Sequence, residues 1–181
     1  MLNDKNQNRL SPTDISTLLA ELSRRLEEEG VPARIHVIGG SALALLFPED
    51  VETRVTNDID ALYKPIPEVQ QIIVEMAEQY GLSPSWLNAH GANYLPEGMP
   101  IVGEVVTVAS PNELIAMKLA ASREQDLYDL GILARHSGIS TPEEMVKIAF
   151  DAYGEDSVIL TESKEDYLIT ARDALARIKK N

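Results

Sequence analysis

The sequence predicts an α/β (α+β) fold, in which a small mixed β-sheet is flanked by helices and followed by a helical C-terminal half. Strand patterns alternate with helix patterns at about residues 31–110, and helix patterns alone follow at about 111–181. The composition, 44% hydrophobic and 25% charged, is typical of a globular protein. No internal repeat or low-complexity tract interrupts the chain, so we expect a single domain over residues 1–181 with its core in the first portion.

The charge balance narrows the classes of function. The 16 basic and 29 acidic residues give a formal net charge of −13, and residues 31–110 contain only three cations, Arg34, Arg54 and Lys64. Such a field repels bare phosphate backbones and disfavours broad nucleic-acid binding. It does not exclude a small nucleotide that is delivered with magnesium.

Other classes are excluded by what the sequence lacks. No apolar run approaches the roughly 18 residues that a membrane-spanning helix needs, so we expect no membrane partner and a cytoplasmic location. Without cysteine the chain has neither disulfides nor thiolate zinc sites. The three histidines, His36, His90 and His136, are scattered, so histidine-based zinc chemistry is not expected.

The first element carries the signals of an amphipathic helix. Ser11 is a typical N-cap, Pro12 suits the first helical position and Gly30 supplies the stop. The apolar positions with helical spacing are Ile15, Leu18, Leu19, Leu22 and Leu26. We therefore expect a helix that begins at Pro12 and buries one face.

The next elements alternate between strand and helix. A strand at residues 34–38 ends at Gly39-Gly40, and residues 41–47 are typical of a short apolar helix that Pro48 stops. Further on we expect, in chain order, a polar loop at 49–57, a strand at 58–63, a helix from Pro67 to Gly81, an irregular connection at 82–100 and a strand at about 101–108. Trp86 is expected to anchor the core beneath the irregular connection.

The helical portion begins with a capping box formed by Ser110 and Glu113. Thr141 and Glu144 repeat this helix start. Breaks between helices are expected near Ser122–Arg123, Gly138 and Gly154.

The first group of residues that indicates chemistry is Gly39-Gly40-Ser41, at a turn from strand to helix. Glycines at such a turn let the backbone come close to a ligand, and the N–H groups of the following helix attract phosphate. The hydroxyl of Ser41 adds a hydrogen-bonding group, so the three residues are candidate nucleotide-binding residues.

The second group is Asp58-Ile59-Asp60 on the next strand. Residues two apart on a strand point to one face, so Asp58 and Asp60 direct both carboxylates the same way while Ile59 faces the core. Two parallel carboxylates repel each other unless they share hard cations, and Mg²⁺ is typically held by one or two carboxylates plus substrate phosphates. A phosphate-binding turn beside such a carboxylate pair is typical of sites that catalyse phosphoryl or nucleotidyl transfer with two metal ions.

These two motifs, taken together, resemble the signature of the nucleotidyltransferase superfamily that includes DNA polymerase beta. The motif residues are Val37-Ile38-Gly39-Gly40-Ser41-Ala42-Leu43 and Arg54-Val55-Thr56-Asn57-Asp58-Ile59-Asp60. The arginine and threonine ahead of the acids are more narrowly similar to bacterial minimal nucleotidyltransferases, including AbiEii-type and MenT-type toxins. The resemblance implies the nucleotidyltransferase fold and two Mg²⁺ ions, or Mn²⁺, on Asp58 and Asp60. An arginine ahead of the acids can orient triphosphate or acceptor phosphate, so Arg54 is a candidate nucleotide-binding residue, and a loop arginine that bridges Asp58 to solvent stays open as the plainer interpretation.

A block in the helical portion resembles the same group. It consists of Val108-Ala109-Ser110-Pro111-Asn112-Glu113-Leu114-Ile115-Ala116-Met117-Lys118-Leu119 and Arg123-Glu124-Gln125-Asp126-Leu127-Tyr128-Asp129-Leu130. The resemblance implies that Lys118 contacts nucleotide phosphate and that Asp126 is an accessory catalytic acid, with Asp129 as a second candidate. Two plainer interpretations stay open: Lys118 as a solvated helix residue, and both acids as partners of Arg123.

The predicted function is transfer of a nucleoside monophosphate from an NTP to a hydroxyl acceptor. The resemblance to the toxins implies the 3′ end of a tRNA as acceptor and an antitoxin protein as partner, whereas the charge keeps a small molecule or a protein side chain open. A third metal-binding carboxylate has no motif match, and Glu104 is the candidate on a strand pattern. The alternatives are therefore a catalytically silent nucleotide- or metal-binding regulatory module, and a protein-interaction partner with an acidic face.

Overall fold

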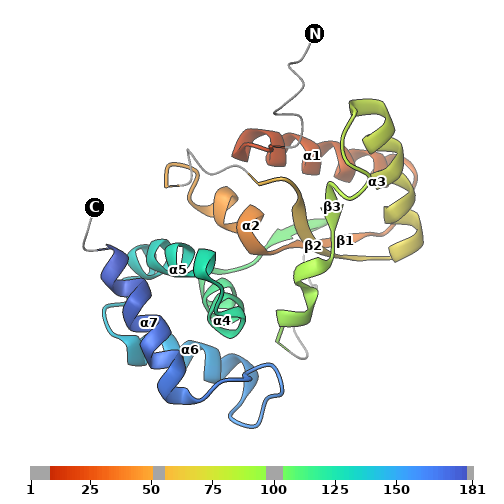
Figure 1. Ribbon diagram of the computed structural model, residues 1–181. Helices are drawn as coiled ribbons and strands as arrows, with labels where there is room; N and C mark the ends of the chain where they lie inside the picture. Colours follow the sequence, from red (N-terminus) through yellow and green to blue (C-terminus); the bar gives the residue numbers. More distant parts are fainter. Residues whose placement is uncertain (1–8, 51–55, 97–103, 179–181) are drawn as a thin grey trace. The chain divides into compact units, whose positions relative to one another are not determined.

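The structure, a computed structural model, divides the chain into two compact units. The residues that it describes are 9–50, 56–96 and 104–178. The first unit comprises Met1–Ala92 with Pro100–Ala109, and the second comprises Asn93–Met99 with Ser110–Asn181. Strands and helices alternate in the first unit, whereas only helices follow Ser110 in the described part of the second (Figure 1).

The first unit is built on a mixed sheet of four strands in the described residues, in the order β3-β2-β1-β4. Strand β1 pairs antiparallel with β2 and parallel with β4, and β2 pairs parallel with β3. The strands are β1 (Arg34–Val37), β2 (Ile59–Lys64), β3 (Leu87–Asn88) and β4 (Val106–Val108). The helices of this unit are α1 (Pro12–Glu28), α2 (Gly39–Leu46) and α3 (Ile66–Tyr80). The mixed sheet with its helices confirms the predicted α/β (α+β) class.

Local capping explains where α1 begins. The Ser11 side chain accepts a hydrogen bond from the backbone N–H of Asp14, and the Asp14 carboxylate accepts one from the Ser11 N–H. The buried face of the helix consists of Ile15, Leu19, Leu22 and Leu26. The predicted N-cap and first residue are thus confirmed, as is the apolar face except for Leu18, which is only half-buried.

Three predictions for the first unit need correction. Helix α2 begins at Gly39, two residues before the predicted start, because the glycines form its first turn rather than a turn ahead of it. The connection predicted at 82–100 is not irregular throughout, since it contains β3 and a 3₁₀ helix at His90–Tyr94. A two-residue strand is too short to show the alternating pattern by which strands are predicted.

The strand predicted at 101–108 is shorter than expected. Glu104 and Val105 lie in a bend, and β4 begins only at Val106. Residues 101–103 lie outside the described residues.

Trp86 lies immediately before β3 and fixes its position. The side chain is 1% exposed, and its indole N–H donates to the carbonyl oxygen of Ile73 in α3 over 3.0 Å. The predicted role of Trp86 as a core anchor is confirmed. The buried indole explains why a short strand forms at this point of an otherwise loop-like segment.

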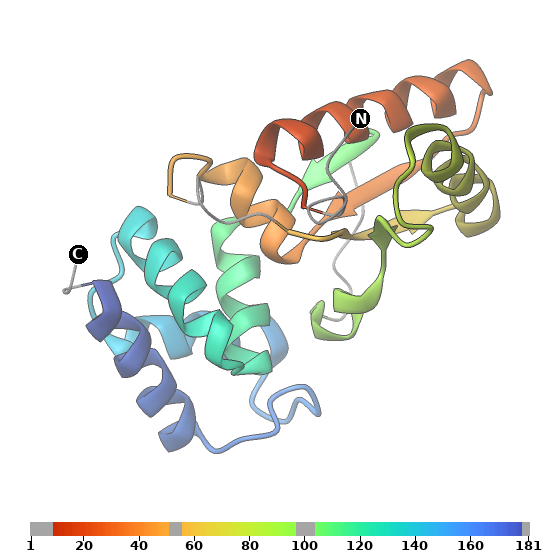
Figure 2. The ribbon, with the colours of Figure 1, turned by 45° about the horizontal axis from the view of Figure 1, so that its top comes forward.

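The described part of the second unit is helical (Figure 2). Its helices are α4 (Pro111–Ala121), α5 (Glu124–Ser137), α6 (Pro142–Tyr153) and α7 (Lys164–Ile178). Helix α4 packs against α5 and α6, and α7 packs against the same two helices. The capping boxes at Ser110 and Thr141 begin α4 and α6 as predicted. No described helix combines the length and the apolar character that crossing a membrane requires.

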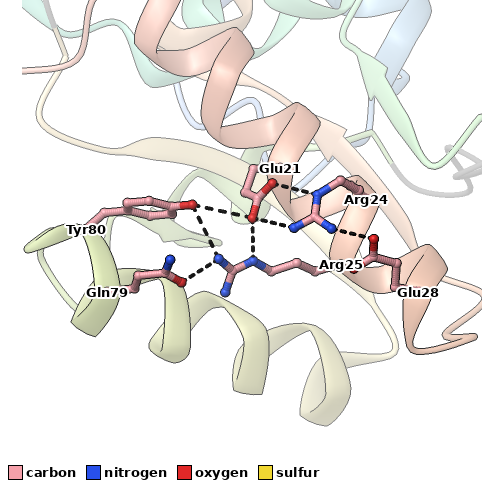
Figure 3. A network of polar contacts seen from close by, with 6 residues as sticks. All are labelled: Glu21, Arg24, Arg25, Glu28, Gln79 and Tyr80. Carbon is pink, nitrogen blue, oxygen red and sulfur yellow. Dashed lines mark hydrogen bonds and ion pairs between the residues drawn. The ribbon is translucent and has the colours of Figure 1, made fainter.

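A network of polar side chains joins α1 to α3 in the first unit (Figure 3). The Glu21 carboxylate accepts hydrogen bonds from Arg24 and Arg25 at 2.7 to 2.9 Å. Arg25 in turn donates to Gln79 over 2.6 Å, and its guanidinium lies 5.7 Å from the ring centre of Tyr80. The two helices are thereby held together at their polar margin as well as through their buried faces.

This network predicts a change of stability with pH. Hydrogen bonds from Arg24 and Arg25 lower the pKa of Glu21 from 4.5 to about 2. Because the folded-state pKa is depressed, the carboxylate stabilises the folded chain above pH 4.5, and this contribution is lost as the pH falls towards 2. The Glu21→Gln variant should therefore unfold at lower urea concentration than wild type at pH 7 and at nearly the same concentration near pH 2. The effect is small because the pair is solvent-screened.

The matched control is Glu78→Gln, which removes an exposed carboxylate from α3. Its urea midpoint should follow that of wild type at both pH values. A Glu21→Gln difference that stays constant from pH 7 to pH 2 would contradict the assignment.

Candidate functional site

The first turn of α2 meets strand β2 at Gly39. Gly39 has a φ of +65°, in the left-handed region that favours glycine. A Cβ atom at this position would lie 2.9 Å from Oδ2 of Asp60, closer than real Cβ contacts. The positive φ favours glycine here, and the close approach places the start of α2 directly against the Asp60 carboxylate. A Cβ atom at Gly40, by contrast, would meet no described residue beyond its own helix and chain neighbours within 4 Å, so a phosphate has room to approach the backbone.

Ser41 fixes the backbone that leads into β2. Its side chain is almost fully buried, and its hydroxyl donates to the carbonyl oxygen of Asp58 over 3.1 Å. The hydroxyl of Thr56 donates to the same carbonyl oxygen over 2.9 Å. Two hydroxyls thus hold the chain at Asp58, and the phosphate contact predicted for Ser41 stays a prediction.

The two predicted metal-binding acids lie on either side of a core residue. Ile59 is fully buried, whereas Asp58 and Asp60 are half-buried. The backbone N–H of Ile38 donates to the carbonyl oxygen of Asp60 over 2.9 Å, which joins the end of β1 to β2. The structure therefore brings Gly39-Gly40-Ser41 and the acid pair together, all within the first unit.

Sequence reasoning missed Asn88, a third polar residue at this place. Asn88 is 7% exposed, lies on β3 opposite Asp60, and donates from Nδ2 to Oδ2 of Asp58 over 2.9 Å. The only signal in the sequence is its position directly after the buried pair Trp86-Leu87. Gly91 then passes close by, since a Cβ atom there would lie 3.8 Å from the Cβ of Asp60.

The donor set fits a hard divalent cation. Carboxylate oxygens are the ligands that Mg²⁺ prefers, and Mg²⁺ is usually held by one or two of them together with substrate phosphates. Among the described residues no three His, Cys, Asp or Glu side chains form a group that could hold a metal ion by itself. The pair Asp58 and Asp60 therefore fits a cation whose coordination a nucleotide completes.

Glu104, the candidate third carboxylate, lies elsewhere in the first unit. It lines a pocket of about 610 Å³ together with Glu27 and other residues of α1, and neither Asp58 nor Asp60 lines that pocket. Arg54, predicted to contact phosphate, lies outside the described residues.

The remaining predicted residues form a buried cluster in the second unit. Nζ of Lys118 on α4 lies 3.2 Å from Oδ1 of Asp126 and 2.5 Å from Oδ2 of Asp129, both on α5. The Lys118 side chain is 5% exposed and the two acids are fully buried. The interpretation of Lys118 as a solvated helix residue is therefore wrong: α4 is buried on all sides over Leu114–Ala120, so its lysine has no route to solvent.

Asp126 also begins α5. Its carboxylate accepts hydrogen bonds from the backbone N–H and from the guanidinium of Arg123, the latter at 2.7 Å. The predicted pairing of Asp126 with Arg123 is thus confirmed. Burial acts to raise the pKa of Asp126, but the hydrogen bond from Arg123 and the charges of Lys118 and Arg123 outweigh it and hold the pKa below its ordinary value.

Comparison with known proteins gives one match. The model of a family described as "Nucleotidyltransferase of unknown function (DUF6036)" matches residues 13–172. No curated protein and no solved structure matches the chain. The match spans both units, and it includes the Gly39-Gly40-Ser41 turn, the acid pair and the Lys118 cluster.

Proposed function

The chain belongs to this family of nucleotidyltransferases, and we propose that it is a magnesium-dependent enzyme that moves a nucleoside monophosphate from an NTP to a hydroxyl acceptor. The observation that carries the proposal is the contact of Gly39 with Asp60, which places the N-terminus of α2 next to the carboxylate pair. Phosphate is attracted to the first and a divalent cation to the second. A nucleoside triphosphate with its bound cation supplies both the phosphate groups and the divalent cation.

The acid pair and the glycine turn of the first unit have separate roles in this proposal. Asp58 and Asp60 hold the cation, and the first-turn N–H groups at Gly39 and Gly40 bind triphosphate oxygens. Mg²⁺, or Mn²⁺ in its place, supplies charge neutralisation and a lower pKa for the acceptor hydroxyl when bound. In the transfer, the acceptor oxygen forms a bond to the α-phosphorus, the bond to the β-phosphate oxygen breaks, pyrophosphate leaves, and the hydroxyl proton passes to solvent.

The roles of Lys118 as a phosphate contact and of Asp126 as an accessory acid, both in the second unit, rest on the resemblance alone and stay predictions. The phosphate contact of Arg54 in the first unit stays a prediction as well. The buried ion pairs of Lys118 favour a structural role, because its ammonium group already donates to two carboxylates.

The acceptor is the least constrained part of the proposal. By resemblance to AbiEii-type and MenT-type toxins we propose the 3′ end of a tRNA, with an antitoxin as protein partner and the cytoplasm as location. The net charge of −13 favours the alternative of a small molecule or a protein side chain, since an extended RNA surface would be repelled.

Parallel reactions with α-labelled and γ-labelled NTPs, in the presence of Mg²⁺ and a cell extract, test the proposal. A nucleotidyltransferase transfers the α-label to an acceptor and releases the γ-label as pyrophosphate. Transfer of the γ-label instead would indicate a kinase and contradict the proposal. The labelled product identifies the acceptor as RNA, protein or small molecule.

A second candidate is a nucleotide- or metal-binding regulatory module without turnover. It is favoured by the two-acid donor set, because the described residues add no third carboxylate to Asp58 and Asp60. NTP binding without transfer of either label, with all four NTPs and with Mn²⁺ as well as Mg²⁺, would support it. The third alternative, an interaction protein whose acidic face binds a basic partner, would be supported by an acid pair far from the glycine turn, and the contact of Gly39 with Asp60 gives it no such support.

A further inference from the structure

Asn88 is a buried polar residue that the proposed reaction has not yet used. It lies on β3, the strand next to β2, where its Cα is paired with that of Asp60. Its side chain reaches the other acid of the pair, because Nδ2 donates to Oδ2 of Asp58 over 2.9 Å. One amide thus connects the neighbouring strand to the acid pair.

The orientation of this amide is fixed by three hydrogen bonds. Besides Asp58, Nδ2 donates to the carbonyl oxygen of Ser85 over 3.2 Å, while Oδ1 accepts from the backbone N–H of His90 over 2.9 Å. An amide turned the other way would oppose its oxygen to a carboxylate and a carbonyl, and its NH₂ group to an N–H donor. The surrounding groups therefore allow only the orientation in which Asn88 donates to Asp58.

This hydrogen bond determines which part of the Asp58 carboxylate is available to a cation. Oδ2 is engaged by a neutral donor, so its position is fixed without an added charge that would repel a metal ion. The backbone of Asp58 is held as well, by the hydroxyls of Ser41 and Thr56. Side chain and main chain of one predicted metal ligand are thus oriented by neighbouring groups, in the way that outer partners orient ligands at metal sites.

We propose that Asn88 is a positioning residue that orients the Asp58 carboxylate for a divalent cation. This inference rests on the proposed function, because it presumes that Asp58 and Asp60 hold the cation. It goes beyond that function in assigning a role to β3, and in explaining how a site with two carboxylates keeps one of them in a fixed orientation.

The test is binding of Mn²⁺ alone, followed by the loss of the electron paramagnetic resonance signal of free Mn²⁺. The proteins are wild type, Asn88→Ala, Asn88→Asp and the control Ser85→Ala, which alters an exposed side chain of the same segment. Loss of an outer partner weakens metal binding by roughly 10- to 100-fold, and we expect Asn88→Ala to fall in this range. Ser85→Ala should bind Mn²⁺ as wild type does.

Asn88→Asp separates positioning from a merely structural role. The aspartate keeps an acceptor for the His90 N–H but has no donor for the Asp58 carboxylate, so the positioning role predicts Mn²⁺ binding at least about 10-fold weaker than wild type. If Asn88→Ala does not fold, Asn88→Asp decides the matter: binding as tight as that of wild type would overturn the inference. Thermal unfolding of each variant shows which proteins are folded at the temperature of the titration.

The two levels of the proposal fail in different ways. Mn²⁺ binding by wild type with an equal affinity in folded Asn88→Ala would overturn the positioning role and leave the proposed function intact. Absence of Mn²⁺ binding by wild type would overturn the assignment of Asp58 and Asp60 as metal ligands, and the positioning role with it.

Discussion

Replacing Asp60 by asparagine is expected to lower the rate of nucleotidyl transfer by at least about 100-fold, since the charge stabilisation that a metal ligand secures amounts to several kcal/mol. Asparagine keeps the shape of the side chain, so the close contact with the first turn of α2 at Gly39 is preserved. What changes is the charge at the place where the cation is proposed to bind.

The experiment is the α-label transfer assay, with Glu68→Gln as matched control. Glu68 is an exposed carboxylate in the first turn of α3, so its substitution removes one negative charge from the same unit without touching the acid pair. Asp60→Asn should keep the wild-type unfolding midpoint within a few degrees. Transfer at the wild-type rate by folded Asp60→Asn would refute the assignment of Asp60 as a metal ligand.

The parts of the fold that were predictable are those with local signals. Ser11, Ser110 and Thr141 begin helices because an N-cap hydroxyl and an acid three residues later satisfy backbone donors within one turn. Gly81 and Gly138 end helices with positive φ. Such interactions span only a few residues, and so the sequence alone is enough to recognise them.

Only the glycine turn and the acid pair of the candidate site were predictable from the sequence. The glycine turn and the acid pair each stand in a short motif, and their juxtaposition follows from the pairing of β1 with β2. Asn88 reaches Asp58 from 30 residues further along the chain, on a strand of two residues. Neither the strand period nor the spacing to the acids marks it in the sequence, because the contact exists only once the sheet is assembled.

The burial of Lys118 could not be predicted from the sequence for a different reason. Most helices show one apolar face, and a lysine on such a helix is expected to be solvated. Helix α4 is buried on all sides, so the same lysine lies in the interior and needs partners there. These partners, Asp126 and Asp129, belong to the next helix, and their pairing with Lys118 depends on how α4 packs against α5.

Lys118→Met is accordingly expected to lower the free energy of unfolding by about 3 to 5 kcal/mol, the usual cost of removing one partner of a buried ion pair. Methionine fills a similar volume, so the loss arises from the two carboxylates that remain buried without the ammonium group. Lys118 pairs with both acids and Arg123 pairs with Asp126, and the substitution removes the first of these cations.

The matched control is Lys147→Met, which breaks an exposed lysine–aspartate pair with Asp151 on α6. An exposed pair contributes at most about 1 kcal/mol, so the control should unfold nearly as wild type does. An equal loss in both variants would show that the burial of Lys118 has no energetic consequence, and would contradict the prediction.

The dependence on pH and a double variant identify the cause of the loss. In wild type the pKa of Asp126 is depressed, so its contribution to stability is present above the unfolded value and is lost as the pH falls. In Lys118→Met, Asp126 loses the charge of Lys118 that helps to lower its pKa, so it gains its proton at higher pH than in wild type and the difference between the two proteins should shrink towards acidic pH. Adding Asp129→Leu removes one of the two carboxylates that have lost Lys118, and should restore part of the lost stability at pH 7. If the double variant is no more stable than Lys118→Met, the loss comes from altered packing of α4 rather than from uncompensated charge.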